Sequence, residues 1–276
     1  MRAWLVAMIL GVCAPVNALA DGPSALKSLI TAGDSKGWEG VGRLDIGRRS
    51  FCTGALIEPD IVLTAAHCLF DPDTLERIDD GEVRFLAGWR NGRALADRGI
   101  KSAAIHPDYV YEGPEGMAYA AQDVALLALN APIQNNSVTP FKTDERPRKG
   151  DAVGVVSYAL NRSNRPALQE LCHVMGRPSG SLVMSCEIDL GSSGAPVFVM
   201  SDDGEPRIVS VISAKGFLRG QPVSVGTGLD SGSLLQLRTA LGSAPEATAP
   251  TSQKPTVRRL TIDAPSNGGG AKFLRP

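Results

Sequence analysis

Short apolar segments alternate with turn-forming residues over most of this chain, and this alternation constrains the fold more than any other feature. Between about residues 35 and 242, the segments are rich in β-branched or apolar residues, and clusters of glycine, proline, aspartate or asparagine separate them. No long helical pattern lies between them, so the sequence predicts an all-β fold, either a barrel or a sandwich. Nine segments are typical of strands: residues 41–47, 50–57, 61–66, 82–88, 123–129, 151–158, 182–188, 195–200 and 207–213.

One helix is predicted near the end of this region. Residues 231–242, SGSLLQLRTALG, place leucines at helical spacing. Ser231 or Ser233 would serve as the N-cap, and Gly242 would end the helix. The folded region is therefore expected to close with a short helix.

The first twenty residues have the pattern of a secretory signal peptide. Arg2 precedes an apolar core that is too short to span a bilayer, and Ala18 and Ala20 fit the small-residue rule for cleavage. Cleavage is predicted after Ala20, and a buried N-terminal helix is the alternative. A lipoprotein signal would have a small residue before Cys13, where this chain has valine, so Cys13 is expected to leave with the signal. The mature protein is therefore expected in the periplasm or outside the cell, without a membrane anchor.

Removal of the signal leaves Cys52, Cys68, Cys172 and Cys186, and an even number of cysteines in an exported chain predicts disulfides. Four cysteines allow three pairings. The pairing of neighbours would close two short loops, and each bridge would stabilise the fold by about 3 kcal/mol. A metal site is the alternative, but the sequence has no CxxC or HxxxH spacing. No metal and no cofactor are therefore expected.

Charge and composition narrow the range of partners. The formal net charge is −1, so no bulk attraction to nucleic acid or to an anionic membrane is expected. Residues 243–276 contain five prolines and a run of three glycines, with little apolar periodicity. Such a segment buries too little surface to offset its ordering entropy, so it is predicted to be a flexible tail. The folded protein is expected to be a monomer.

Three polar residues lie in or beside apolar segments, where burying their side chains would cost free energy unless each finds a hydrogen-bond partner. His67 follows an apolar run in LTAAHC, Asp123 begins the apolar run DVALLAL, and Ser193 lies in the glycine-flanked turn GSSGAP. A serine, a histidine and an aspartate can supply a nucleophile, a base and an orienting group. His67 would take the proton of Ser193, and Asp123 would hold the other ring nitrogen. These three residues are therefore the predicted catalytic set.

The three motifs resemble those of the chymotrypsin/trypsin-like serine protease family, and they occur in that family's order. IHPDY, residues 105–109, is similar to the family's turn before the aspartate. The resemblance covers about residues 35–242 and implies two six-stranded antiparallel β-barrels, an active site between them and a short C-terminal helix. It assigns the oxyanion hole to the backbone N–H groups of Gly191 and Ser193. A protease domain is therefore predicted over residues 21–242.

The sequence departs from the commonest family pattern at Ser192, where an aspartate usually precedes the nucleophile. In trypsin-like zymogens that aspartate pairs with a newly cut N-terminal ammonium. Ser192 carries no charge, so we expect no activation by N-terminal insertion, and signal removal alone would suffice. The cysteine spacing resembles bacterial members, including the glutamyl-endopeptidase-like group. That group has a histidine in the strand that lines its specificity pocket, whereas residues 209–216, VSVISAKG, have none, so glutamate specificity is not expected.

The same resemblance assigns the residues that would bind the substrate. Glu187 lies six residues before Ser193, at the position that the family uses for the base of its pocket. An acid there would favour lysine or arginine before the scissile bond. Asp189 competes for this role, and a solvated surface position is the alternative for Glu187. Residues 213–216 are expected to form the edge that pairs with the substrate backbone, which makes Ser213 a predicted substrate-binding residue.

The sequence therefore predicts an exported serine endopeptidase that hydrolyses peptides or proteins through an acyl-enzyme. The alternative from another class is a catalytically silent protease fold that binds peptides or a partner. A serine esterase of another fold is disfavoured, because a nucleophile elbow needs GxSxG between strand and helix and the order serine, aspartate, histidine. Here the histidine comes first, and GSSGAP leads into a predicted strand.

Overall fold

The structure, a computed structural model, describes residues 22–47, 50–114, 116–144 and 147–243 of the 276. The predicted signal peptide and the predicted C-terminal tail lie outside these residues, apart from Ser243 at the end of the last helix. Both predictions, and the domain limits drawn from them, therefore stay predictions. No helix formed by the described residues is long and apolar enough to cross a membrane.

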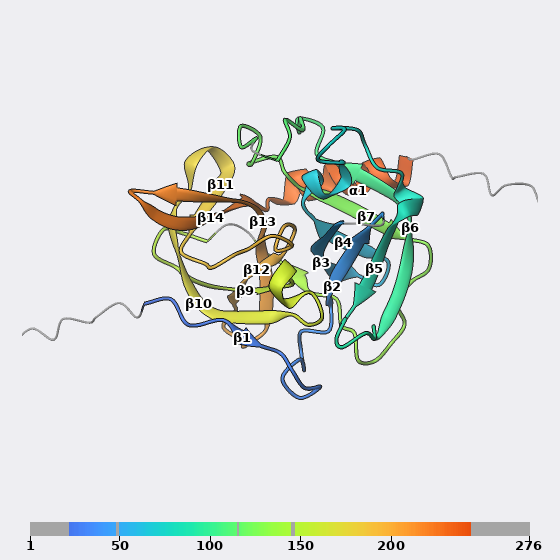
Figure 1. Ribbon diagram of the computed structural model, residues 1–276, viewed down its shortest axis with the longest axis horizontal. Helices are drawn as coiled ribbons and strands as arrows, with labels where there is room; N and C mark the ends of the chain where they lie inside the picture. Colours follow the sequence, from blue (N-terminus) through green and yellow to red (C-terminus); the bar gives the residue numbers. More distant parts are fainter. Residues whose placement is uncertain (1–21, 48–49, 115, 145–146, 244–276) are drawn as a thin grey trace, which may run out of the picture. The chain divides into compact units, whose positions relative to one another are not determined.

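The first half of the described chain closes into an antiparallel barrel, blue to green in Figure 1. Its strands follow the order β2-β3-β4-β7-β6-β5, and β5 pairs with β2 to close the ring. Alternation along β2 buries Leu44 and Ile46, whereas Arg43 and Asp45 are partly exposed. The strands are β2 (Val41–Ile46), β3 (Ser50–Glu58), β4 (Ile61–Thr64), β5 (Val83–Ala87), β6 (Ala96–Ile105) and β7 (Ala125–Leu129).

The second half forms another six-stranded barrel, with the order β10-β11-β14-β13-β12-β9. Pairing between β9 and β10 closes this ring. Two short strands add to it, because β1 pairs with β10 and β8 runs parallel to β13. The strands are β1 (Lys27–Ser28), β8 (Lys142–Thr143), β9 (Ala152–Ser157), β10 (Ala167–Gly176), β11 (Ser181–Met184), β12 (Pro196–Met200), β13 (Pro206–Leu218) and β14 (Gln221–Gly228).

The two barrels share one apolar cluster of buried side chains. Val41 and Ala55 contribute from the first barrel, and Val156 and Phe198 contribute from the second. Phe198 packs edge-on against Phe141, with ring centroids 4.9 Å apart. Because protein interiors are close-packed, this cluster holds the barrels in one arrangement, and with them the residues that each barrel contributes to the cleft.

The described part of the chain ends in helix α1 (Ser231–Ser243), which packs against β6 and β7 of the first barrel (Figure 1). The predicted helix is confirmed, and it runs one residue past Gly242. Its N-cap is Asp230 and not Ser231 or Ser233, because the Asp230 carboxylate accepts the N–H of Ser233 at 2.9 Å. Within the described ranges, four short 3-10 helices lie in the loops: η1 (Ala66–Leu69), η2 (Asp80–Glu82), η3 (Leu160–Arg162) and η4 (Pro178–Gly180).

The predicted fold class is confirmed, with two six-stranded antiparallel β-barrels and a short C-terminal helix. Each of the nine predicted segments overlaps a strand, although segment 182–188 runs four residues past the end of β11 and β13 extends well beyond segment 207–213. The sequence prediction lacks β6, β10 and β14, which complete the two rings. β6 reads ADRGIKSAAI and β14 reads QPVSVGTG, so charges, small residues, proline and glycine obscure the strand pattern. Pairing with neighbouring strands makes these segments strands, because β-propensity depends strongly on context.

Candidate active site

His67 lies in the short helix η1, directly after strand β4. Ala65 and Ala66 are fully buried, so their small side chains let this turn pack closely against the barrel. The next residue, Cys68, forms a disulfide with Cys52 on β3 and ties the turn to that strand. The imidazole ring is therefore anchored, and 24% of the His67 side chain stays accessible.

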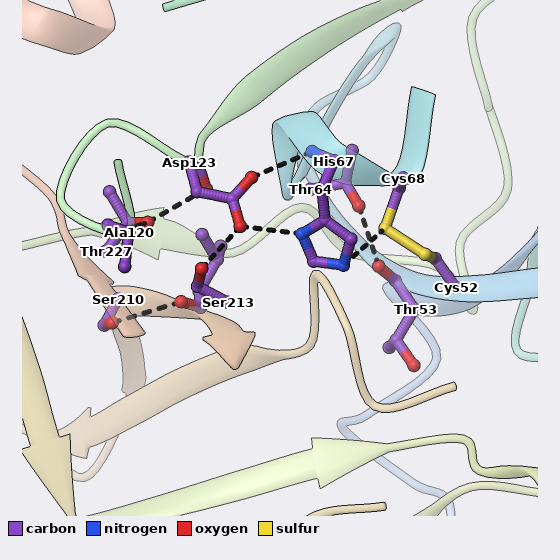
Figure 2. Close-up of polar contacts among 11 residues, drawn as sticks. Cys52, Thr53, Thr64, His67, Cys68, Ala120, Asp123, Ser210, Ser213 and Thr227 are labelled. Atoms are coloured by element: carbon purple, nitrogen blue, oxygen red, sulfur yellow. Dashed lines mark hydrogen bonds and ion pairs between the residues drawn. A yellow bond between two sulfur atoms is a disulfide. The ribbon is translucent and has the colours of Figure 1, made fainter. Parts of the chain in front are cut away.

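Asp123 is almost fully buried two residues before β7, and its carboxylate holds His67 twice, as Figure 2 shows. Oδ1 accepts the backbone N–H of His67 at 2.8 Å, and Oδ2 lies 2.7 Å from Nδ1 of the ring. Oγ of Ser213 also donates to Oδ2, at 2.5 Å. Because an ionised carboxylate can only accept, Nδ1 carries the hydrogen, and Nε2 is left to take a proton.

Two opposing effects set the pKa of His67. Burial lowers this pKa because it disfavours the charged ring, whereas the charge of Asp123 and its hydrogen bond raise it. The influence of Asp123 prevails, and the pKa of His67 lies above its ordinary value of 6.5. Asp123 therefore stabilises the imidazolium, which is the form that a general base reaches when it takes a proton.

The turn that carries Ser193 packs against the segment just before the histidine. The carbonyl oxygen of Ser193 accepts the N–H of Thr53 at 2.8 Å. A Cβ on Gly194, which has a φ of 73°, would lie 2.1 Å from Oγ1 of Thr64 and 2.9 Å from the nitrogen of Ala65. Only glycine permits so close an approach with this backbone conformation. The turn therefore reaches the first barrel at the end of β4.

The three predicted catalytic residues, His67, Asp123 and Ser193, line one cleft of about 600 Å³. Phe70 and Tyr111 stack in the wall of the same cleft, with ring centroids 4.9 Å apart. Within the described residues, no hydrogen bond joins Oγ of Ser193 to Nε2 of His67. Such bonds are often long in an active site without substrate and shorten in the complex. The structure thus places all three side chains in one cleft and connects two of them directly.

The predicted oxyanion-hole residues also line this cleft. Gly191 has a φ of 93°, and a Cβ there would lie 2.4 Å from Cε2 of Phe51, so both conformation and space require glycine. Among the described residues, the N–H groups of Gly191 and Ser193 donate to no protein acceptor. Two such free N–H groups beside a serine can bind a developing oxyanion.

Of the two predicted substrate-binding residues, Ser213 lines the cleft and Glu187 does not. Glu187 is exposed and lies outside the set of residues that line the cleft, so the structure gives no support to its predicted place at a pocket base. Its backbone N–H donates instead to Oε1 of Gln169 at 2.7 Å. Asp189, Ser213 and Lys215 do line the cleft. Counting back from the nucleophile assumes a fixed loop length, and the loop here places Asp189 at the wall instead.

The second disulfide joins Cys172 on β10 to Cys186, so both predicted bridges are confirmed with neighbours paired. Cys52, His67 and Cys68 form the one cluster of potential metal ligands within the described ranges. The two cysteines of this cluster share a disulfide, so their sulfur atoms are not available as thiolate ligands.

Two polar residues of the site have roles that the sequence pattern did not indicate. The hydroxyl of Ser213, expected at the substrate edge, donates to Asp123. Thr53, fully buried on β3, contacts Ser193 through its N–H and Gly191 through its hydroxyl. A buried polar residue in the apolar segment SFCTGALI is the signal that could have indicated the role of Thr53, because buried hydroxyls need partners.

A sequence model of the trypsin family matches residues 32–182, which is more than half of the chain and includes His67 and Asp123. The CLIP domain-containing serine protease B10 of Anopheles gambiae is 30% identical over 140 residues, or 43% of this chain and 36% of that protein. The vitamin K-dependent protein C of Rattus norvegicus is 30% identical over 112 residues, or 40% of this chain and 22% of that protein. The chain therefore matches well under half of the length of either relative.

Solved structures share the architecture. A Glu endopeptidase in complex with MPD superimposes with a TM-score of 0.62 at 16% identity, covering 80% of this chain and 98% of that one. A thermostable serine protease, AL20, from an extremophilic microorganism gives a TM-score of 0.59 at 16% identity, covering 74% of this chain and 98% of that one. At this identity the two structures show the fold alone.

Proposed function

The chain belongs to the trypsin family of serine proteases, and we propose that it is an exported serine endopeptidase with Ser193, His67 and Asp123 as its catalytic triad. One observation carries the proposal. The buried carboxylate of Asp123 holds Nδ1 of His67 at 2.7 Å, in a cleft that Ser193 also lines. This arrangement leaves Nε2 as the ring nitrogen that can exchange a proton with the serine.

Hydrolysis would proceed in two halves. Nε2 of His67 takes the proton of Ser193 while Oγ attacks the carbonyl carbon of the scissile peptide bond, which gives a tetrahedral intermediate. His67 then gives this proton to the leaving amine, the C–N bond breaks, and an acyl-enzyme remains on Ser193. Water attacks the ester while His67 takes one of its protons, and Oγ leaves with that proton. Asp123 keeps the ring in one tautomer and stabilises its charged form throughout.

The oxyanion of each tetrahedral intermediate would be bound by backbone donors. The N–H groups of Gly191 and Ser193 have no acceptor among the described residues, so they are available to it. Loss of one such donor typically raises the barrier by about 3 kcal/mol.

Strand β13 offers an edge on which a substrate backbone could pair. Its pairing with β12 ends at Val211, whereas its pairing with β14 continues to Leu218. Within the described chain, residues 213–216 therefore have a strand partner on one side only. A peptide can add there as a further strand, which supports peptides or proteins as substrates.

Ser192 supports activity without a second proteolytic cut. Its hydroxyl is fully buried, 3.4 Å from Oγ of Ser157 and 3.3 Å from the carbonyl oxygen of Tyr158, and it accepts the N–H of Asp189 at 3.3 Å. All three partner groups are uncharged, so this site does not need an N-terminal ammonium. Expression of residues 21–276 with a blocked N-terminus tests this point. We expect full hydrolysis, and inactivity relieved only by a defined cut would contradict it.

Export is supported by the two disulfides, which persist in oxidising compartments such as the periplasm or the exterior of the cell. We propose a monomer that acts on peptides or proteins. A preference for lysine or arginine before the scissile bond would come from Asp189, which lines the cleft, and not from Glu187.

Cleavage of a peptide library, read by mass spectrometry, tests the function and the specificity together. We expect peptide-bond cleavage by the wild type, with kcat lowered by about 10⁴ or more in Ser193→Ala. The second candidate is a silent protein that binds peptides, and it rests on the absence, within the described residues, of a hydrogen bond between Oγ of Ser193 and Nε2 of His67. Binding of library peptides without any cleavage would establish that candidate and refute the protease.

A further inference from the structure

Thr53 of β3 contacts the oxyanion turn, defined here as residues 189–194, with both its backbone and its side chain. Its N–H donates to the carbonyl oxygen of Ser193 at 2.8 Å, and its Oγ1 donates to the carbonyl oxygen of Gly191 at 2.9 Å. The same Oγ1 accepts the N–H of Tyr158 at 3.1 Å. Thr53 is fully buried, so no water can replace these partners when the hydroxyl is removed.

The oxyanion turn has every carbonyl from residue 189 to residue 193 held by a donor. Because a peptide unit is planar and trans, a held carbonyl also fixes the N–H on the opposite side of that unit. The carbonyls therefore stay out of the cleft, and the N–H groups of Gly191 and Ser193 stay available. The donors are N of Ser192 for Asp189, N of Leu160 for Leu190, Oγ1 of Thr53 for Gly191, N of Ala195 for Ser192 and N of Thr53 for Ser193.

Thr53 supplies two of these donors, and its hydroxyl is the one side-chain donor among them. The two carbonyls that it holds, those of Gly191 and Ser193, flank Ser192. A side-chain donor can be removed by substitution while the backbone bonds of β3 remain. This makes the contribution of the hydroxyl measurable on its own.

Thr53 also connects the two halves of the site. Its own carbonyl oxygen accepts Oγ1 of Thr64 at 2.9 Å, as Figure 2 shows, and Thr64 ends the strand that leads to His67. One residue of the first barrel thus contacts the turn that carries Ser193 and the strand that leads to the base. Displacement of the turn relative to His67 would break the two bonds from Thr53 to the turn.

We propose that Thr53 is a positioning residue for the oxyanion hole, an inference that rests on the serine protease function proposed above. Its neutral hydroxyl holds the peptide on the N-terminal side of Ser192, and its N–H holds the peptide on the C-terminal side of Ser193. The N–H groups of Gly191 and Ser193 belong to the adjacent peptide units, whose carbonyls are those of Leu190 and Ser192. The bonds of Thr53 therefore act on these N–H groups through the Cα atoms of Gly191 and Ser193, with no charged side chain involved. Thr53 is fully buried and is not among the residues that line the cleft, so it acts through the turn and not by contact with the substrate.

The test compares Thr53→Val, which keeps the shape and removes the hydroxyl, with Thr53→Ser, which keeps the hydroxyl. We expect T53V to lower kcat by about 10- to 100-fold with KM changed less than threefold, since a displaced oxyanion donor costs less than a deleted one. Affinity for a peptidyl trifluoromethyl ketone, whose adduct carries an oxyanion, should fall in parallel with kcat. Thr53→Ser should keep most of the wild-type kcat and most of the wild-type affinity for the ketone.

Ser224→Ala serves as the matched control for the loss of a buried hydroxyl. Ser224 is fully buried on β14, and its Oγ donates to the carbonyl oxygen of Met184 at 3.4 Å, outside the oxyanion turn. We expect S224A to lower the melting temperature without changing kcat. A lowered melting temperature in T53V with kcat within twofold of wild type would reduce Thr53 to a purely structural role and overturn the proposal.

Amide hydrogen exchange separates this proposal from the protease function. The N–H of Ser192 donates to the carbonyl oxygen of Asp189 at 2.9 Å, and the N–H of Gly194 donates to the carbonyl oxygen of Ile212 on β13 at 2.7 Å. T53V should raise their exchange rates by about tenfold or more, which corresponds to about 1.4 kcal/mol of lost protection, and T53S should not. Unchanged exchange in T53V refutes the positioning role. A wild type that neither cleaves peptides nor reacts with a fluorophosphonate refutes the protease function, while the exchange rates still show whether Thr53 holds the turn.

Discussion

His67 and Asp123 are joined twice: Nδ1 of the ring lies 2.7 Å from Oδ2, and the backbone N–H of His67 donates to Oδ1 at 2.8 Å. One carboxylate therefore fixes both the backbone and the ring of the same histidine. This double attachment sets the tautomer of the ring and the direction of its free nitrogen.

Asp123→Asn should lower kcat by about 10⁴ with little change in KM, because an amide can stabilise the wrong tautomer and cannot stabilise the imidazolium. Steady-state hydrolysis of a peptide substrate measures this. Asp203→Asn is the matched control, since Asp203 is exposed on a surface turn and should leave kcat unchanged. A D123N variant within tenfold of wild type would show that Asp123 does not orient the base.

The raised pKa of His67 gives activity and stability opposite responses to pH. A general base must be neutral, so kcat/KM should fall as the pH drops through the pKa of His67, which lies above 6.5. In Asp123→Asn this fall in kcat/KM should occur at lower pH, because the charge that raises the pKa is gone. The contribution of His67 to folding stability has the other sign. It is complete below about 6.5, the pKa in the unfolded chain, and is lost as the pH rises through the higher folded-state pKa.

Chemical unfolding of wild type and His67→Gln across this pH range isolates that contribution. The difference in unfolding free energy between the two should shrink as the pH rises through the folded-state pKa. A difference that grows with pH would mean that the pKa of His67 is lowered on folding.

Gly191→Ala should lower kcat by about 100-fold or more, because the oxyanion donor would have to move. A Cβ there would lie 2.4 Å from Cε2 of Phe51, in addition to the strain of a positive φ. Gly150→Ala is a matched control, since Gly150 has a φ of 95° and no atom lies within 4 Å of its Cβ position. G150A should cost about 1 kcal/mol of stability and leave kcat intact. Equal kinetic losses in both variants would assign the effect to backbone strain alone.

Removal of either disulfide should lower the unfolding free energy by about 3 kcal/mol, because the bridges close loops of similar length, with separations of 16 and 14 residues. The two disulfides should differ in their effect on kcat. Cys68 directly follows His67, so Cys52→Ala/Cys68→Ala should lose more kcat than Cys172→Ala/Cys186→Ala at a temperature where both are folded. Equal kcat in the two double variants would show that the first bridge does not position the histidine.

The alternation of apolar segments and turn formers predicted an all-β fold, and the nine apolar segments overlap strands of the two barrels. The resemblance of three motifs to the serine protease family, in that family's order, implied two barrels with a site between them. His67, Asp123 and Ser193 do line one cleft.

The sequence pattern did not predict the contacts between residues that lie far apart in the chain. Glu187 was assigned by counting along a loop, whereas the path of that loop leaves its side chain outside the cleft and places Asp189 at the wall. The hydroxyl of Ser213 and the two contacts of Thr53 depend on pairing between residues far apart in the sequence. Such contacts arise from the closure of the barrels and from the interface between them, which no single segment encodes.

Covalent labelling by a fluorophosphonate, with the modified residue mapped by mass spectrometry, tests the central claim most directly. An activated serine reacts far faster than an ordinary one, and activation here requires the imidazole. Wild type should be labelled at Ser193, and His67→Ala should be labelled at least about 100-fold more slowly. Wild type that is not labelled at Ser193, or that is labelled no faster than H67A, would contradict a catalytic partnership between these two residues.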